Sequence, residues 1–259
     1  MTLGEQLAEL RFNILRDRSD LIAGDRDSLW TDETLLEYIK DGERRFARQS
    51  LILRDGNTPE ICTFNIAAPA AGETYGEKTY VLHPSILAVI SAKYDNKFSD
   101  LIRSGHSLVV PAPPSEYMTY DKPAQFDLPP SDPVAFYTDE TLVYASKNRV
   151  TLSIFPRPGA DQGGKQIAMR VVRLPTTCYD KQHLDIESQI PEDYQLDVLE
   201  WAAYRAQRTW DGDAGAPTTS DAHKAAFDDA VVRAQKERQA MMFANVNFRY
   251  GRNGFTYTR

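Results

Sequence analysis

The side chains that most often carry chemistry are few in this sequence, and their spacing favours none of the common sites. Histidine, cysteine and carboxylate side chains bind metal ions when short spacings bring them together. We find no histidine that is spaced with Cys, Asp or Glu as a ligand set, so we expect no metal and no cofactor. The histidines, for which we expect surface or capping roles, are His83, His106, His183 and His223.

Cysteine usage is equally uninformative about function. Cys62 and Cys178 are the only cysteines, and they lie far apart in the sequence. They provide neither a disulfide framework nor a Cys-x-x-Cys metal pair. Two isolated thiols fit a reducing compartment.

Three short motifs resemble functional signatures but fail on spacing or context. DGDAG at 211–215 resembles the start of a calcium loop, but its twelfth position is Ala222, where a bidentate Glu is required. GGK at Gly163–Lys165 lacks the spacing of a phosphate-binding loop, and we interpret it as a hairpin turn between two strands. Asp139 and Glu140 are adjacent in a turn, where side chains diverge, so we expect no carboxylate dyad. The sequence therefore predicts that the protein is not an enzyme.

Composition limits the remaining functions. The chain has 259 residues, of which 42% are hydrophobic and 26% charged, which is typical of a soluble globular protein. The net charge of −7 argues against a protein that wraps nucleic acid, because phosphate binding needs a basic surface. No apolar run approaches the length of a membrane span. The N-terminus lacks the basic start and apolar core of a signal peptide.

The stretch from Trp30 to Arg54 predicts the central helix of the fold. Thr31 can cap its start, and the acidic residues after it suit the helix dipole. Gly42 lies within the apolar stripe, where only a close packing partner would justify a glycine. We expect residues 55–57 to end the helix. The stripe, with steps of three or four residues, consists of Leu35, Ile39, Gly42, Phe46, Ser50 and Leu53.

Three other stretches have the same helical period. The first helix is predicted from about Leu3 to Arg18, with a capping box formed by Thr2 and Glu5. Pro191 fits the first turn of a third helix, and Ser220 or Asp221 caps a fourth that runs to about Met242. The residues expected to face inward are Leu3, Leu7, Leu10 and Ile14 in the first helix, Leu196, Leu199, Ala203, Ala206 and Trp210 in the third, and Phe227, Ala230, Ala234 and Met241 in the fourth.

The third helix carries unusual aromatic bulk, at Tyr194, Trp201, Tyr204 and Trp210. We expect most of it in the core. A helix with more than one apolar face can also serve a subunit interface, and this alternative stays open.

Between the helix pairs, short β-like runs broken by proline and glycine replace the helical period. Seven or eight short strands with polar turns favour a β-sandwich or small barrel. Pro111 to Pro133 holds many prolines and no clear strand, and we interpret it as a long surface loop. The expected strands are at 61–66, 79–84, 86–91, 107–111, 134–138, 141–145, 150–156 and 165–175.

We therefore predict an α+β fold. The N- and C-terminal helix pairs form a four-helix bundle, an antiparallel β-sandwich or barrel domain is inserted between them, and an extended C-terminal tail follows. The predicted domains are residues 1–57 with 185–242 for the bundle, 58–184 for the β-domain and 243–259 for the tail. The predicted bundle core contains Leu35, Ile39, Phe46, Leu199, Trp201 and Phe227.

The tail after Met242 has no acidic residue, three arginines and five Phe or Tyr residues. It is too short for a core of its own, so we expect a docking arm that is unstructured until it orders on a partner. Stacking on nucleic acid and addition of a strand to a partner sheet are both compatible with its pattern. The residues expected at this portal or subunit interface are Phe243, Phe248, Arg249, Tyr250, Arg252, Phe255, Tyr257 and Arg259.

The order of these patterns resembles the head–tail adaptor (connector) proteins of tailed phages, including the tail tubular A type of short-tailed phages. The most recognisable part is W-[ST]-D-E-x-L-L-x-Y-[IL], carried by Trp30 to Ile39. The resemblance covers nearly the whole chain, and its motifs are structural rather than catalytic. The other matching stretches are TLGEQLAELRFNILRD, YVLHPSILAV, VTLSIFPRP and PEDYQLDVLEWAAYRA.

The resemblance implies a structural virion protein that is assembled in the host cytoplasm and lies in the neck or tail. In such proteins the helical part forms a dodecameric ring below the portal, around the DNA channel, and the C-terminal segment reaches toward the portal. The implied partners are the portal ring, identical subunits and a tail nozzle or tube protein, with tail fibres as a further candidate. Genomic DNA would pass through the channel without specific binding, which suits a net negative subunit.

A different class of function stays open at this point. The protein can be a tail-associated binding module whose β-domain holds a fibre, another tail protein or a glycan. An enzyme with a site in the Pro111 to Pro133 loop lacks the residues that it would need.

Overall fold

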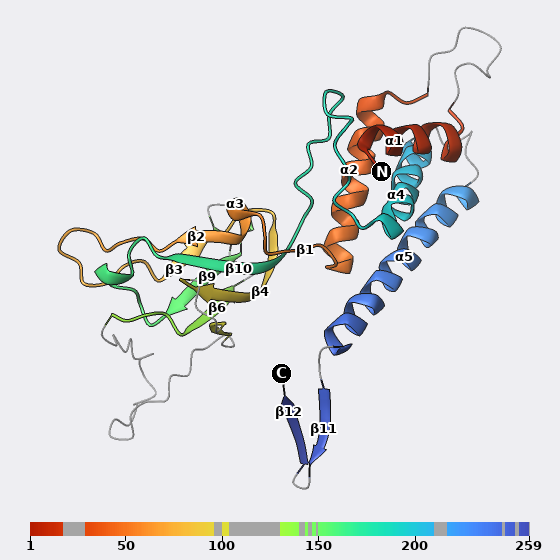
Figure 1. Cartoon of the computed structure of the whole chain (residues 1–259). Coiled ribbons are helices and arrows are strands. Elements are labelled where there is room, and N and C mark those ends of the chain that lie inside the picture. Colours follow the sequence, from red (N-terminus) through yellow and green to blue (C-terminus); the bar gives the residue numbers. More distant parts are fainter. Residues whose placement is uncertain are drawn as a thin grey trace. The chain divides into compact units, whose positions relative to one another are not determined.

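The contacts of the computed structural model divide the chain into two compact units (Figure 1). The helical unit comprises Met1–Leu53 with Leu174–Arg259, and the β-unit comprises Arg54–Arg173. The mixed α+β class is confirmed. The structure describes residues 1–17, 29–95, 100–103, 130–139, 143–144, 147–148, 150–209, 217–244, 247–251 and 254–258.

The first helix is shorter than its sequence period predicts. α1 spans Leu3–Ala8 and begins with the expected capping box, in which Thr2 and Glu5 bond to each other's backbone N–H. A π-helix, η1 (Glu9–Ile14), continues it. Arg16 has a positive φ of 54°, which ends the helical run before the expected Arg18, a residue outside the described part of the chain.

α2 spans Asp32–Ser50 and begins at Thr31, whose side chain accepts the N–H of Thr34 as expected. Its predicted stripe from Leu35 to Ser50 is buried. The helix ends earlier than predicted, because Leu51 adopts the left-handed conformation with φ 53°. Leu53 therefore lies beyond the helix.

Gly42 lets α2 approach α4 (Gln195–Thr209) closely. A Cβ atom at this position would lie 2.9 Å from the carbonyl oxygen of Val198, a distance that real Cβ atoms essentially never show. The indole N–H of Trp201 donates to Asp41 over 2.7 Å beside it. The close partner expected from the sequence is thus α4.

In the C-terminal helices, most residues that were predicted to face inward are buried, but some are exposed. Leu199, Ala203 and Ala206 of α4 are fully buried, but Leu196 is 55% exposed because it lies off the buried face. A short 3-10 turn, η3 (Glu192–Tyr194), precedes α4. Trp210 lies outside the described residues.

α5 spans Pro217–Ala244, so it begins before Ser220 and ends after Met242. Proline suits a first helical position, because its missing N–H would be unpaired there in any case. Phe227, Ala230 and Ala234 are fully buried as expected, but the inward position predicted for Met241 is wrong, since that side chain is 58% exposed.

Aromatic rings join three of these helices. The ring centroid of Phe46 on α2 lies 5.1 Å from that of Tyr194 and 6.1 Å from that of Phe227 on α5. Phe227 is also 5.3 Å from Trp201 on α4. A neighbouring cluster packs α1 against α2 and α4, with Leu3, Leu10, Leu35, Ile39 and Leu199 fully buried. A four-helix bundle stays our interpretation of this packing.

The β-unit contains two four-stranded sheets (Figure 1). In the first sheet, β10 pairs antiparallel with β1, β2 and β4. The second has the order β3-β9-β6-β5. The elements are β1 (Arg54–Asp55), α3 (Pro59–Cys62), β2 (Thr63–Asn65), β3 (Thr79–Val81), β4 (Ile86–Tyr94), β5 (Ile102–Arg103), β6 (Ala135–Asp139), β7 (Val143–Tyr144), β8 (Lys147–Asn148), β9 (Thr151–Phe155), η2 (Ala160–Gln162) and β10 (Gln166–Arg173).

Both sheets contribute to one hydrophobic core. Val89 and Ile167 from the first sheet share it with Phe136, Leu152 and Ile154 from the second. The described strands form no closed barrel, so that alternative is wrong. The expectation of purely antiparallel strands is also wrong, because β5 and β6 pair in parallel.

Some predicted strands and turns in this region differ from the structure. Ile61 and Cys62, the first residues of the strand predicted at 61–66, belong instead to the short helix α3, because Pro59 suits its first helical position. The GGK hairpin is also wrong: Gly163 follows η2, and the strands on either side, β9 and β10, belong to different sheets. The strand predicted at 107–111 and residues 111–129 of the predicted loop lie outside the described part of the chain.

The C-terminal segment contains paired strands instead of the expected unstructured, extended tail. β11 (Asn247–Gly251) and β12 (Gly254–Thr258) form an antiparallel hairpin. Alternating aromatic residues favour strands, and the sequence Gly-Arg-Asn-Gly favours a tight turn between them. No helix in the described residues has the length and apolar character to cross a membrane.

Candidate functional site

Two of the motifs weighed for chemistry fall on residues that the structure does not describe. Asp139 ends β6, but Glu140 lies outside the described residues, as does the acidic stretch 211–215. The expectations of no carboxylate dyad and no calcium loop therefore stay predictions.

Two of the histidines have local structural roles. Nδ1 of His83 lies 2.7 Å from Oγ of Ser85, at the turn before β4. Nδ1 of His223 lies 2.5 Å from a carboxylate oxygen of Glu200, which joins α5 to α4. These positions agree with the expected surface or capping roles, and His106 lies outside the described residues.

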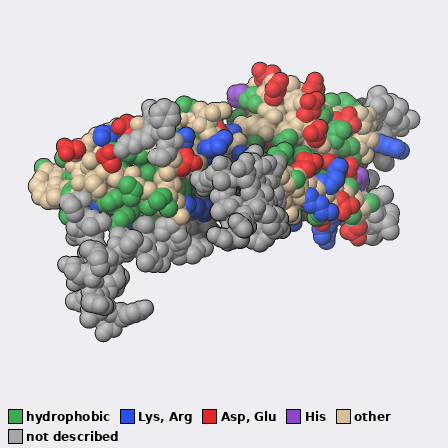
Figure 2. Space-filling view, turned by 60° about the horizontal axis from the view of Figure 1, so that its bottom comes forward, with side chains coloured by type: hydrophobic (Ala, Val, Ile, Leu, Met, Phe, Trp, Pro, Cys, Tyr) green, Lys and Arg blue, Asp and Glu red, His purple; other side chains and the backbone are tan. Residues whose placement is uncertain are grey.

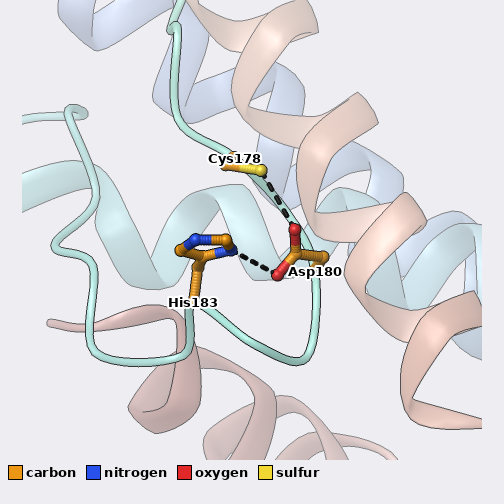
Figure 3. Close-up of side chains that lie close together, drawn as sticks. All are labelled: Cys178, Asp180 and His183. Atoms are coloured by element: carbon orange, nitrogen blue, oxygen red, sulfur yellow. Dashed lines mark hydrogen bonds and ion pairs between the residues drawn. The ribbon is translucent and has the colours of Figure 1, made fainter.

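His183 lies in a candidate ligand cluster that the sequence analysis did not single out, and the expectation of no metal stays a prediction. Potential ligand atoms of Cys178, Asp180 and His183 all lie within 4.8 Å of one another. The three side chains converge, with Asp180 between the other two (Figure 3). The thiol of Cys178 donates to Oδ2 of Asp180 over 3.1 Å, and Nδ1 of His183 lies 2.6 Å from Oδ1. The pattern C-x-D-x-x-H is visible in the sequence, so a search of such spacings would have found it.

Hydrogen bonding within this cluster sets its protonation. The hydrogen bond to Asp180 is the largest cause that raises the pKa of the Cys178 thiol, because it stabilises the protonated form. The same bond lowers the pKa of Asp180, with His183 as the next cause. The carboxylate is therefore ionised between a neutral thiol and an imidazole.

A buried carboxylate anchors the cluster to the helices. Glu43 on α2 is fully buried, and it accepts hydrogen bonds from the Tyr179 hydroxyl, from Ser188 over 2.5 Å and from Gln6 over 3.2 Å. Burial, followed by the charge of Glu43, raises the pKa of Tyr179, so this phenol stays protonated. Tyr179 lies between Cys178 and Asp180 in the chain, so the network holds the cluster's backbone in place.

A second candidate surface lies at the end of α5. Of the described residues 235–241, none is buried. α5 continues past the C-terminal end of α2 (Figure 1), and Gln235 donates to the carbonyl of Gln49 near that end. Met241 is 58% exposed and Val232 is 45% exposed.

The hairpin that follows α5 pairs aromatic positions with aromatic positions. Phe248 is opposite Tyr257, and Tyr250 is opposite Phe255. Arg249 is opposite Thr256. Arg252 and Arg259 lie outside the described residues, and only the backbone of Phe243 and of the two strands is described. The predicted interface residues thus include two cross-strand aromatic pairs.

Charged side chains of both signs are interspersed over the described residues on the face shown in Figure 2. The whole sequence has 30 Lys and Arg residues against 37 Asp and Glu residues. Several cations are paired with acids, including Arg233 with Asp197 over 2.8 Å and Lys181 with Glu33 over 2.7 Å. This distribution suits protein contacts better than phosphate binding.

Comparison with known proteins identifies one family. The family model described as SU10 adaptor protein matches residues 1–249. A search of curated proteins finds no match.

Proposed function

The chain belongs to the SU10 adaptor protein family, and from this premise we propose that it is a head-to-tail adaptor whose copies form a ring below the portal. The family supports a structural component of a bacteriophage virion that contacts other head and tail proteins, and it is not a class of enzymes. Our proposal adds a dodecameric ring of the kind found in short-tailed phages, with tail tubular A as the related type. The ring would continue the DNA channel between the capsid and a tail nozzle or tube protein.

The observation that carries the proposal is the end of α5. The last turns of this helix keep apolar residues such as Met241 without burying them within the subunit. Met241 lies in helical register with the buried residues Phe227 and Ala234, so a partner chain that continued this packing would cover it. We infer that a neighbouring subunit or the portal covers it.

The hairpin that follows α5 in the chain adds aromatic positions to the proposed interface. Alternate positions along a strand share one face, so the register assigns four aromatic positions to one side of the hairpin, namely Phe248, Tyr250, Phe255 and Tyr257. Aromatic residues are enriched among the residues that dominate binding energy. Arg249, Arg252 and Arg259 would add charge-assisted contacts with acidic residues of the partner.

Truncation after Ala244 tests this proposal. The shortened chain should keep the circular dichroism spectrum and melting temperature of the full chain, yet no longer co-sediment with portal rings. Arms around a ring act together through avidity, so the loss should be large. Undiminished docking would remove the hairpin from the interface, and unfolding would assign the hairpin to the subunit's own fold.

A matched pair of variants separates the aromatic face from the hairpin itself. Phe248→Ser with Tyr257→Ser removes one aromatic pair, whereas Asn247→Ser with Thr258→Ser changes the neighbouring polar pair. We expect the first double variant alone to weaken assembly. Equal effects would indicate that the hairpin backbone, rather than its aromatic positions, contacts the partner.

We propose further that the β-unit is an inserted domain. The β-unit begins at Arg54, a few residues before the predicted start at residue 58. It ends at Arg173, further from the predicted end at residue 184. Arg173 bonds to Asp55 over 2.6 Å, so the two ends of the β-unit are joined. Replacing Arg54–Arg173 by a short flexible linker should leave a folded helical unit by circular dichroism. A random-coil spectrum would contradict separate folding.

DNA should pass such a ring without specific binding. The net charge of −7 and the paired cations disfavour phosphate contacts. In a gel-shift assay at physiological salt we expect weak affinity with no sequence preference. A nanomolar dissociation constant would remove the passive-channel part of the proposal.

A binding role for the β-unit is the second candidate, supported by its exposed apolar side chains. Ile102 is 69% exposed and Val134 is 55% exposed, and the backbone N–H of Ile102 donates to the carbonyl of Val134. Hydrophobic side chains also gather on the β-unit in Figure 2. This surface suits another tail protein or a fibre more than a glycan. Binding by the isolated β-unit to tail proteins, without ring formation, would favour this candidate.

A further inference from the structure

The cluster at Cys178, Asp180 and His183 combines three kinds of metal ligand within six residues. A thiol, a carboxylate and an imidazole are the side chains that zinc takes in proteins. Their ligand atoms lie within 4.8 Å of one another, and the side chains point toward one another (Figure 3). All three are accessible to solvent, since Asp180 is half-buried and the other two are exposed.

We propose that Cys178, Asp180 and His183 bind a divalent transition-metal ion, and that zinc fits this donor set best. Calcium and magnesium prefer oxygen ligands, whereas thiolate and imidazole select zinc and its neighbours in the first transition row. The inference does not depend on the adaptor role, because it follows from the ligand atoms alone.

The distances between the side chains fit a tetrahedral ion after small movements. Zinc bonds of roughly 2.0–2.3 Å separate neighbouring ligand atoms by roughly 3.3–3.5 Å. In the structure, Sγ of Cys178 lies 3.1 Å and Nδ1 of His183 lies 2.6 Å from the nearest carboxylate oxygen. Each pair would move apart by less than about 1 Å to admit the ion. Water or a side chain of a partner would take the fourth position.

The segment that carries the ligands is held at both sides, which lowers the entropy that binding must overcome. On one side the Tyr179 hydroxyl is bonded to the buried Glu43. On the other side the carbonyl of Leu184 accepts the N–H of Gly4 over 2.8 Å, and that of Ile186 accepts the N–H of Leu3 over 2.9 Å. The ligands are therefore partly preorganised on the helical unit.

The charges of the cluster suit a divalent cation once the Cys178 thiol is deprotonated. The Cys178 thiol would lose its proton to solvent, and the His183 proton would reside on Nε2 so that Nδ1 could bind the ion. A thiolate and a carboxylate together neutralise a divalent cation. The nearby Lys181 is already paired with Glu33, over 2.7 Å, which limits its repulsion of the ion.

Cobalt(II) titration of the full chain, without a histidine tag, tests the site. A thiolate ligand gives a charge-transfer absorption, which should saturate at one ion per chain and disappear when zinc is added. Cys178→Ser should abolish the band and weaken binding by more than about 100-fold, which exceeds the loss typical of residues outside the ligand set. His183→Gln should weaken binding comparably.

Two controls keep the test decisive. His83→Gln changes another exposed histidine and should leave the titration unchanged. Cys62 is 1% exposed, so alkylation of the folded chain should block Cys178 selectively and reproduce Cys178→Ser without a substitution. Absence of the band, or a band that survives in Cys178→Ser, would overturn the proposal.

Discussion

The two segments of α5 have opposite relations to the core of the helical unit. From 220 to 234 the helix buries Phe227, Ala230 and Ala234 completely. From 235 to 241 none of the described residues is buried, although Met241 continues the same apolar stripe. The change occurs where α2 ends, because Gln235 bonds to the carbonyl of Gln49, one residue before the last of α2.

This comparison teaches that a periodic stripe identifies the face of a helix but not what covers it. Within the subunit, α2 and α4 cover the first segment. The second segment has strong helix formers and bonds to the rest of the subunit through Gln235 and Glu237, but it buries no side chain among residues 235–241. Its helical state therefore rests largely on propensity and on continuity with the first segment. The apolar stripe of α5 continues beyond the part of the helix that α2 and α4 cover, and on this we base the proposed interface with another chain.

The largest effect should follow from removing a ring in the covered part of the unit. Phe46→Ala should lower the free energy of unfolding by roughly 3–5 kcal/mol, because the side chain is fully buried between Tyr194 and Phe227. The control is Leu196→Ala on α4, where a 55% exposed side chain should cost less than about 1 kcal/mol. Urea unfolding measures both, and similar losses would contradict the assigned core.

Glu43→Ala should have the next largest effect, about 2–3 kcal/mol, because it leaves buried hydrogen-bond donors without their acceptor. Those donors are the hydroxyls of Tyr179 and Ser188 and the amide of Gln6. Glu37 on the same helix pairs with Lys40 at the surface, so Glu37→Ala should change stability by less than about 1 kcal/mol. An equal effect of the two substitutions in urea unfolding would argue against a structural role for the network.

Asp55 in the β-unit provides a smaller, pH-dependent effect. Burial of Asp55 raises its pKa, but hydrogen bonds from Asn57, Thr58 and Arg173 outweigh burial and hold the pKa of Asp55 well below its usual range. A lowered folded pKa stabilises the protein above the unfolded pKa of about 3.9, and this contribution is lost as the pH falls toward the folded value.

We therefore expect Asp55→Asn to cost about 2 kcal/mol at pH 7, the value of a charged hydrogen bond. The difference from the unchanged chain should shrink as the pH falls below about 4. Asp161 is an exposed acid of the same unit, and Asp161→Asn should leave the pH profile unchanged. Urea unfolding across this pH range measures both, and a constant difference would contradict the depressed pKa.

Capping and burial were predictable where local chemistry determines them. The capping box of Thr2 and Glu5 predicted the start of α1, and Thr31 predicted the start of α2. Gly42 indicated a close packing partner, which is α4. The end of α2 was not predictable, because Leu51 takes a left-handed conformation for which its residue type carries no preference.

The ligand cluster shows a different limit. The spacing of Cys178, Asp180 and His183 is visible in the sequence, but their convergence depends on the turn between them. That turn is held by Tyr179 on the buried Glu43, a contact between residues far apart in the chain. No periodicity encodes such a contact, so spacing alone could only have suggested the cluster.

The smallest effect on stability should come from a substitution in residues 235–241 of α5. Comparing its effects on stability and on assembly tests whether this segment serves the subunit's own core or a partner. Met241→Ser should change the free energy of unfolding by less than about 0.5 kcal/mol, because the side chain is 58% exposed. If a partner covers Met241 in the assembly, the same substitution should weaken ring formation or portal docking by about tenfold. Gln239→Ser, at an exposed position of the same segment, carries the same cost in helix propensity and should leave assembly unchanged. Sedimentation and urea unfolding of the two variants give the comparison. Should Met241→Ser destabilise the isolated chain, the segment would belong to the subunit's own core, and equal assembly by both variants would remove Met241 from the interface.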